Sequence, residues 1–149
     1  MTKAMRQWRR TPERGSAVLE LVVLAPVLLL FVMAVIFAGR WAMAQMAVQS
    51  AAAEAARAAS IARSAGEAAG DASASAAASL TNQSVKCSSQ SVSVDTGAFG
   101  LPIGTPGVVS ATVTCVVDMS DLSLPGIPGS RTLTHTSTSP LDTYRGRQG

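Results

Sequence analysis

The residue types that most often carry out chemistry are scarce in this chain. It has one histidine, His135, and two cysteines, Cys87 and Cys115. Zinc ribbons and fingers need four Cys or His ligands at close spacing, which this set cannot supply. A cysteine nucleophile needs a base and an orienting group, and His135 has no Asp or Asn at a motif spacing. We therefore expect no metal, no cofactor, no small-molecule substrate and no enzymatic activity, with His135 a structural residue on a strand.

One carboxylate stands out by its position. Glu20 directly precedes a long apolar run. A charged side chain near a membrane costs free energy unless it is paired or reaches the interface. Two interpretations are open: Glu20 is an interfacial carboxylate near Arg14, or it pairs with a positive group on a neighbouring subunit.

The basic character of the chain comes from its N-terminal tip. Residues 1–15 carry five basic groups against one acidic group, whereas residues 41–149 carry six basic and seven acidic groups. A nucleic-acid-binding protein would present a basic stripe on its folded body. The charge distribution therefore argues against a nucleic acid as partner.

An uncharged segment of membrane-spanning length follows the tip. The 19 residues from Leu21 to Gly39 carry no charge, and a bilayer core of about 30 Å needs about 20 apolar residues in a helix. Arg40 and Trp41 end the run in the manner of a headgroup boundary. A buried core helix, or a secretory signal cleaved within residues 38–44, would be the alternatives. The basic tip predicts a plasma-membrane protein with its N-terminus in the cytoplasm and its C-terminal part outside.

The start of this segment carries a recognisable pattern. Arg14-Gly15-Ser16-Ala17-Val18-Leu19-Glu20 resembles a type IV pilin-like processing site, in which Glu is the fifth residue after the Gly. With Arg14, Pro26, Gly39-Arg40 and the alanine-rich Ala55–Ala59 stretch, residues 14–57 resemble the TadE-like family of Flp (tight adherence) pilus assembly proteins.

The resemblance implies a function, partners and site residues. The chain would be a membrane-anchored, pseudopilin-like structural component of Flp/Tad-type pilus assembly or secretion machinery, assembled into a surface pilus. Gly15 and Ser16 would flank a prepilin-type cleavage site, and Glu20 would align subunits. Partners would be other Tad/Flp subunits, the membrane platform complex and a prepilin peptidase. A stand-alone, membrane-anchored extracytoplasmic binding module is the alternative.

Two further patterns follow the apolar run. Residues 42–79 hold 19 alanines in 38 positions without proline, which predicts that the membrane helix continues to about residue 65. This stretch would be a solvated spacer or would pack on a sheet. From Val85 onward, Val alternates with Ser and Thr, which predicts half-buried strands separated by Pro/Gly-rich loops.

The expected fold is a single-pass membrane protein with a long N-terminal α-helix, transmembrane and then alanine-rich, followed by a small antiparallel β module (α+β). We divide the chain into a cytoplasmic leader (1–15), a transmembrane helix (16–40), a helical extension (41–80) and an extracytoplasmic β-rich module (81–149). Cys87 and Cys115 lie in expected strands on the oxidising side, which predicts a disulfide; two reduced, buried thiols would follow from the opposite topology.

Overall fold

The computed structural model describes residues 14–118, 120 and 129–144 of the chain. The chain divides between Ile36 and Phe37 into two compact units. The first contains the start of helix α1 (Arg14–Ile61), and the second contains the rest of α1 and every other described element. We call the second unit, from Phe37 onward, the exterior module, after the position that we propose for it below.

The first unit is an apolar helix with one proline inside it, Pro26. Proline lacks a backbone N–H, so the Val22 carbonyl loses its usual partner four residues along the helix. The rest of the segment consists of residues that a helix tolerates well. In lipid, a helix would also be the way for this segment to pair its backbone N–H and C=O groups by hydrogen bonds.

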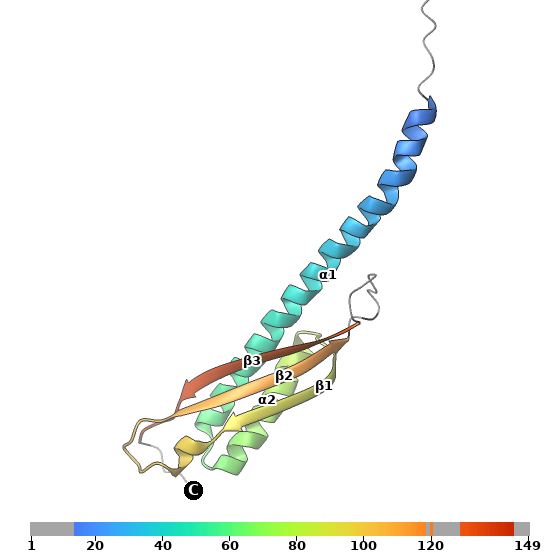
Figure 1. Cartoon of the computed structure of the whole chain (residues 1–149). Coiled ribbons are helices and arrows are strands. Elements are labelled where there is room, and N and C mark those ends of the chain that lie inside the picture. The colour runs from blue at the N-terminus through green and yellow to red at the C-terminus, as the bar shows by residue number, and fades with distance from the viewer. Residues whose placement is uncertain (1–13, 119, 121–128, 145–149) are drawn as a thin grey trace, which may run out of the picture. The chain divides into compact units, whose positions relative to one another are not determined.

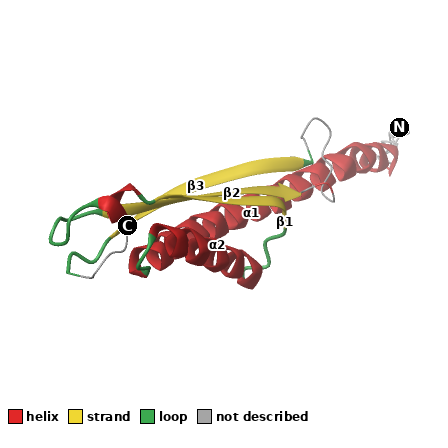
Figure 2. Ribbon diagram, turned by 90° about the horizontal axis from the view of Figure 1, so that it is seen from below, coloured by secondary structure: helices red, strands yellow, loops and turns green. Residues whose placement is uncertain are grey.

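The exterior module places two helices against one face of a three-stranded sheet (Figures 1 and 2). The strands β1 (Cys87–Asp95), β2 (Val108–Asp118) and β3 (Ser130–Pro140) form an antiparallel meander with β2 in the centre. Along β2, every second side chain from Val109 to Val117 is buried. This period-two pattern is the alternation of Val, Ala and Cys with Ser and Thr in the sequence.

A tight turn separates α1 from α2 (Ala65–Asn82). The Ser64 hydroxyl accepts a hydrogen bond from the Glu67 backbone N–H at 3.2 Å, and the Glu67 carboxylate accepts one from the Arg63 N–H at 2.9 Å. The first bond satisfies one of the N–H groups that the start of a helix leaves without partners, and the second ties Glu67 back to the residue before the cap. The turn therefore starts a new helix with its own cap.

The far end of α2 closes with a left-handed residue. Ser84 has φ +58°, while the Val85 N–H donates to the Leu80 carbonyl at 3.1 Å and the Ser84 N–H to the Thr81 carbonyl at 3.0 Å. This pair of bonds is a Schellman motif, in which Gly is the usual left-handed residue. It directs the chain out of α2 into β1.

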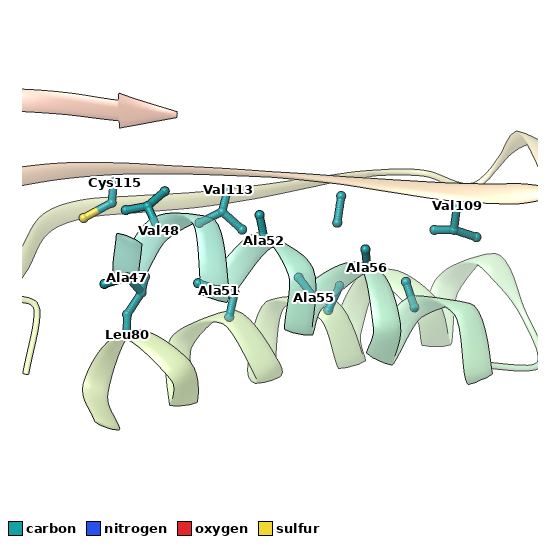
Figure 3. Close-up of a cluster of buried hydrophobic side chains, with 14 of the residues drawn as sticks. Ala47, Val48, Ala51, Ala52, Ala55, Ala56, Leu80, Val109, Val113 and Cys115 are labelled. Atoms are coloured by element: carbon teal, nitrogen blue, oxygen red, sulfur yellow. The ribbon is translucent and has the colours of Figure 1, made fainter. Parts of the chain in front are cut away.

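Alanine builds most of the core. Figure 3 shows Val48, Ala52 and Ala56 facing the sheet, and Ala47, Ala51 and Ala55 on the side toward α2. All six are at most 1% exposed. The buried positions recur every three and four residues, which is one continuous stripe of an α-helix. Side chains this small let helix and sheet backbones approach closely, and we call this stripe the alanine seam.

α2 and the sheet supply the opposing surfaces of the seam. On α2 the buried residues recur every four positions, so a single line of the helix faces the core. The buried residues opposite the seam are Ala68, Ala72, Ala76 and Leu80 of α2, and Val109, Ala111, Val113, Cys115 and Val117 of β2.

The connector between β1 and β2 closes the end of the core farthest from Arg40. A short 3₁₀ helix, η1 (Gly97–Gly100), buries Phe99 to 3% exposure. A Cβ on Gly107 would lie 2.9 Å from the Ala98 Cβ, so glycine is needed for this close approach. The Gly107 carbonyl accepts a hydrogen bond from the Leu141 N–H at 2.9 Å, which joins the connector to the end of β3.

A disulfide joins Cys87 at the start of β1 to Cys115 in β2, with the two Cα atoms 5.4 Å apart. The Cys87–Cys115 disulfide predicted from the sequence is therefore confirmed. Cys115 lies on the buried face of the central strand with no exposed surface. The bridge closes the sheet beside a β-bulge between Cys87 and Ser89, where the strand pairing is irregular.

The expected fold class is confirmed: a long, apolar N-terminal helix precedes a small antiparallel sheet. The alanine-rich stretch packs on the sheet, one of the two arrangements expected for it. The helix expected to continue to about residue 65 ends at Ile61, and after the capped turn at Ser64 the rest of the stretch forms a second helix. The division into leader, span, extension and β module stays a prediction.

Breaking the bridge should destabilise the exterior module by an amount that depends on which cysteine is replaced. The bridged residues are 28 apart, so Cys87→Ser should lower the free energy of unfolding by roughly 3–4 kcal/mol. Cys115→Ser should cost about 1–3 kcal/mol more, because it buries a hydroxyl among apolar groups. Denaturant unfolding monitored by circular dichroism measures both. Equal losses for the two variants would contradict the burial argument.

Candidate functional site

The apolar part of α1 carries the longest run of exposed hydrophobic side chains in the described chain. The exposed fraction is 69% at Leu21, 67% at Phe31 and 44% at Ile36. The helix is long and apolar enough to cross a membrane, and none of its most apolar window is buried by the described protein. A helix that is apolar on all sides needs lipid or other apolar helices around it.

Glu20 lies at the start of this surface. Its side chain is exposed, and its neighbours Val18, Leu21 and Val22 are exposed as well. Ser16 precedes it by four residues in the same helix, and residues four apart share a helix face. A carboxylate here lies within one helical turn of any positive group carried on Ser16.

The remaining motif residues are spread along α1. Arg14, Gly15 and Ser16 fall within the bounds of the helix, but their side chains lie outside the described residues. A Cβ built on Gly39 would meet nothing within 4 Å. The described fold therefore does not itself require glycine there. The roles expected for these residues, and for Pro26 and Arg40, stay predictions.

His135 lies in β3 opposite Val113 and is half-buried, on the helix-facing side of the sheet. It borders a groove of about 360 Å³ whose helix side is lined by Trp41, Gln45 and Gln49. Among the described residues, no group of three or more His, Cys, Asp or Glu side chains is placed to hold a metal ion.

The other face of the sheet carries hydroxyl groups. Ser or Thr occupies most outward positions of the three strands, and two cross-strand pairs contact through their hydroxyls: Thr112 with Thr136 at 2.8 Å, and Thr114 with Thr134 at 3.2 Å. Such pairs stabilise adjacent strands. This face is polar and carries charge only toward its ends, so it is built for contact with water or with polar partners.

Two contacts between α1 and β3 could not be predicted from the sequence. The Ser139 hydroxyl donates to the buried Ser60 hydroxyl at 3.0 Å, and Ser60 donates to the Arg57 carbonyl at 2.8 Å. At the other end of β3, the guanidinium carbon of Arg131 lies 5.9 Å from the centre of the Trp41 ring.

The capped turn between α1 and α2, by contrast, has a signal in the sequence, because Ser64-x-x-Glu67 has the spacing of a capping box.

A carboxylate lies at the same end of the sheet as Arg131. Hydrogen bonds from Ser120, first from its hydroxyl and then from its backbone N–H at 2.9 Å, lower the pKa of Asp118 below its ordinary value. Each bond favours the charged form of the carboxyl group. Asp118 is therefore ionised at neutral pH.

Comparison with known proteins bears on the first third of the chain. Residues 15–57 match the family described as TadE-like protein. No curated protein and no solved structure matches the chain. The matched residues lie within α1, so they include the exposed apolar surface and most of the alanine seam, and they leave out α2 and the sheet.

The match agrees with the resemblance drawn from Arg14, Gly15, Glu20 and Pro26, and it ends at Arg57 as that pattern does. Residues 15–57 of the chain are therefore similar to TadE-like proteins.

Proposed function

We propose that the protein is a membrane-anchored, pseudopilin-like structural subunit of Tad/Flp-type pilus assembly or secretion machinery. The observation that carries this proposal is the coincidence of the family match with α1. The matched helix has an exposed apolar surface before Phe37 and a buried alanine seam after it. One helix thus supplies both the membrane anchor and the core helix on which α2 and the sheet of the exterior module pack.

The proposed mechanism is lateral packing of apolar helices. The apolar surface of α1 would contact lipid, the corresponding helices of other subunits and the membrane platform complex. Van der Waals packing drives such association inside a bilayer, where lipid tails are as apolar as the helices. Ionic pairs at the boundary then set the register in which subunits align.

Glu20 is the residue we assign to that alignment. A prepilin peptidase would cleave between Gly15 and Ser16, leaving a free amino group on Ser16. The Glu20 carboxylate of one subunit would pair with the Ser16 amino group of its neighbour. The pairing would satisfy two charges that lipid would otherwise penalise.

The orientation we propose places residues 1–15 in the cytoplasm and the exterior module outside the plasma membrane. The disulfide supports this side for the module, because disulfides persist in oxidising compartments. The positive tip supports it as well, since basic flanks stay in the cytoplasm.

Labelling should verify the orientation. Asp142 is exposed beyond the end of β3, so Asp142→Cys should react with a membrane-impermeant maleimide in intact cells after wall removal. Cys87 and Cys115 are blocked by their bridge, and the parent chain serves as the unlabelled control. Reaction only after lysis would place the module inside and refute the proposed topology.

The mature N-terminus tests the cleavage step. Mass spectrometry of the protein purified from its membrane should show a chain beginning at Ser16, with residues 1–15 absent. Gly15→Val should prevent the cut and leave the leader attached, while membrane insertion is unchanged. A parent chain that keeps its leader would rule out processing, and Glu20 would then have to pair with Arg14 or another basic group.

Replacing Glu20 separates assembly from simple anchoring. Glu20→Gln keeps the shape and removes the charge, so the protein should insert normally while recovery of partner subunits falls by about tenfold or more. A loss of this size is expected because a hydrogen bond to a charged group contributes about 1.5–3 kcal/mol, which Glu20→Gln would remove. Quantitative pull-down of the subunits measures it.

Glu54→Gln is the matched control. Glu54 is an exposed carboxylate on the same helix but within the exterior module, so its replacement should leave partner recovery unchanged. Unchanged recovery with Glu20→Gln as well would reject the alignment role. The remaining explanation would be an anchored extracytoplasmic binding module.

A further inference from the structure

Cations gather at one end of the exterior module. β1 and β3 begin at this end and β2 finishes there, as Figure 1 shows for the strand directions. Arg131 is the second residue of β3, and Lys86 directly precedes β1. Lys86 and Arg40 line the same depression beside the end of β2. Among the described residues, Asp118 is the acidic group at this end, so this end carries three cationic side chains and one anionic side chain.

Aromatic side chains accompany these cations. Arg131 lies over the ring of Trp41, and these two residues with Phe37 and Ala38 line an apolar hollow of about 330 Å³. A guanidinium on an aromatic ring keeps its N–H groups at the edge, where they remain able to donate. This combination of an apolar floor and a cationic rim is typical of side chains at the level of lipid headgroups.

The opposite end of the module has no comparable excess of cations. Asp95 ends β1 and Asp142 follows β3, while Glu67 lies in the first turn of α2. Arg57 near the end of α1 and Arg63 in the α1–α2 turn accompany these acidic groups. Among the described residues, the excess of cations is therefore at the end where the strands meet Arg40. Such a charge distribution orients a body above an anionic surface.

We propose that Arg40, Trp41, Lys86 and Arg131, which we call the basal surface, bind the phosphate groups of anionic lipid headgroups. The inference rests on the membrane anchoring proposed above. The uncharged run ends at Gly39, so the basal surface begins with the first residue beyond the apolar span. Its apolar hollow favours a lipid over a soluble anion, because free phosphate offers nothing to cover Phe37 and Trp41. Headgroup binding would seat the exterior module against the bilayer.

Lipid-dependent stability tests the basal surface. The full chain is placed in nanodiscs of phosphatidylcholine alone, or of phosphatidylcholine mixed with phosphatidylglycerol, and thermal unfolding of the module is followed by circular dichroism. Anionic lipid that binds only the folded module should raise the Tm of the parent chain by at least about 4 °C. High salt should remove this rise, because it screens exposed charges.

Two double variants with the same change of charge locate the effect. Lys86→Gln with Arg131→Gln should abolish the lipid-dependent rise. Arg57→Gln with Arg63→Gln removes two exposed cations far along α1 and in the α1–α2 turn, and it should keep the rise. Lys86→Arg with Arg131→Lys preserves the charge and should also keep it. Native mass spectrometry of phosphatidylglycerol retained by each variant gives a readout independent of folding stability.

An equal rise in the two charge-removing variants, or a rise produced by inorganic phosphate in phosphatidylcholine discs, would overturn the headgroup assignment. A chain that fails to enter nanodiscs would overturn both this inference and the proposed anchoring. A parent chain that inserts and shows the rise while Glu20→Gln leaves partner recovery intact would remove the assembly role alone.

Discussion

The close approach that alanine permits is the constraint on which the rest of the structure depends. The seam on α1 presents methyl groups to the sheet on one side and to α2 on the other, with no larger buried side chain on α1 than Val48. Packing of this kind gains its stability from dispersion between backbones brought near each other rather than from large apolar area. It also tolerates little enlargement, since an added methylene on the seam would force helix and sheet apart.

A core so poor in large side chains depends on covalent and hydrogen-bonded closures. Phe99 is the one aromatic residue fully buried among the described residues. The disulfide restrains β1 on β2, the Ser60–Ser139 bond holds the end of α1 to β3, and the Gly107–Leu141 bond closes the connector. The disulfide lies toward one end of the module and the other two contacts lie at the opposite end, so both ends of a small core are restrained.

The sequence predicted features that depend on local pattern. The apolar run, the alternation of Val113 and Cys115 with threonines, and the cysteine pair each have a signature within a few residues. The TadE-like resemblance came from spacing in one helix, where Gly15, Glu20 and Pro26 keep fixed positions. The reversal at Ser64 was missed because alanine content favours helix on both sides of it, although Glu67 supplied the capping signal.

Contacts between distant residues had no such signature. Arg131 and Trp41 are ninety positions apart, and nothing in either segment indicates that one lies over the other. Their meeting depends on the strand register and on the side of the sheet that α1 covers, which are properties of the assembled module. The excess of cations at one end of the module is hidden for the same reason, since Lys86 and Arg40 come together only after α2 has turned the chain back.

The alanine seam has a mechanical consequence. In the exterior module, α1 lies alongside the strands rather than across them (Figure 2). A pull along the axis of α1 therefore loads the seam in shear, so that many small contacts bear the force together instead of separating one after another. The disulfide adds a covalent tie between β1 and β2 near the end that such a pull reaches first. Resistance to force is governed by the rate of unfolding rather than by equilibrium stability, and this geometry slows unfolding even in a module whose core is small.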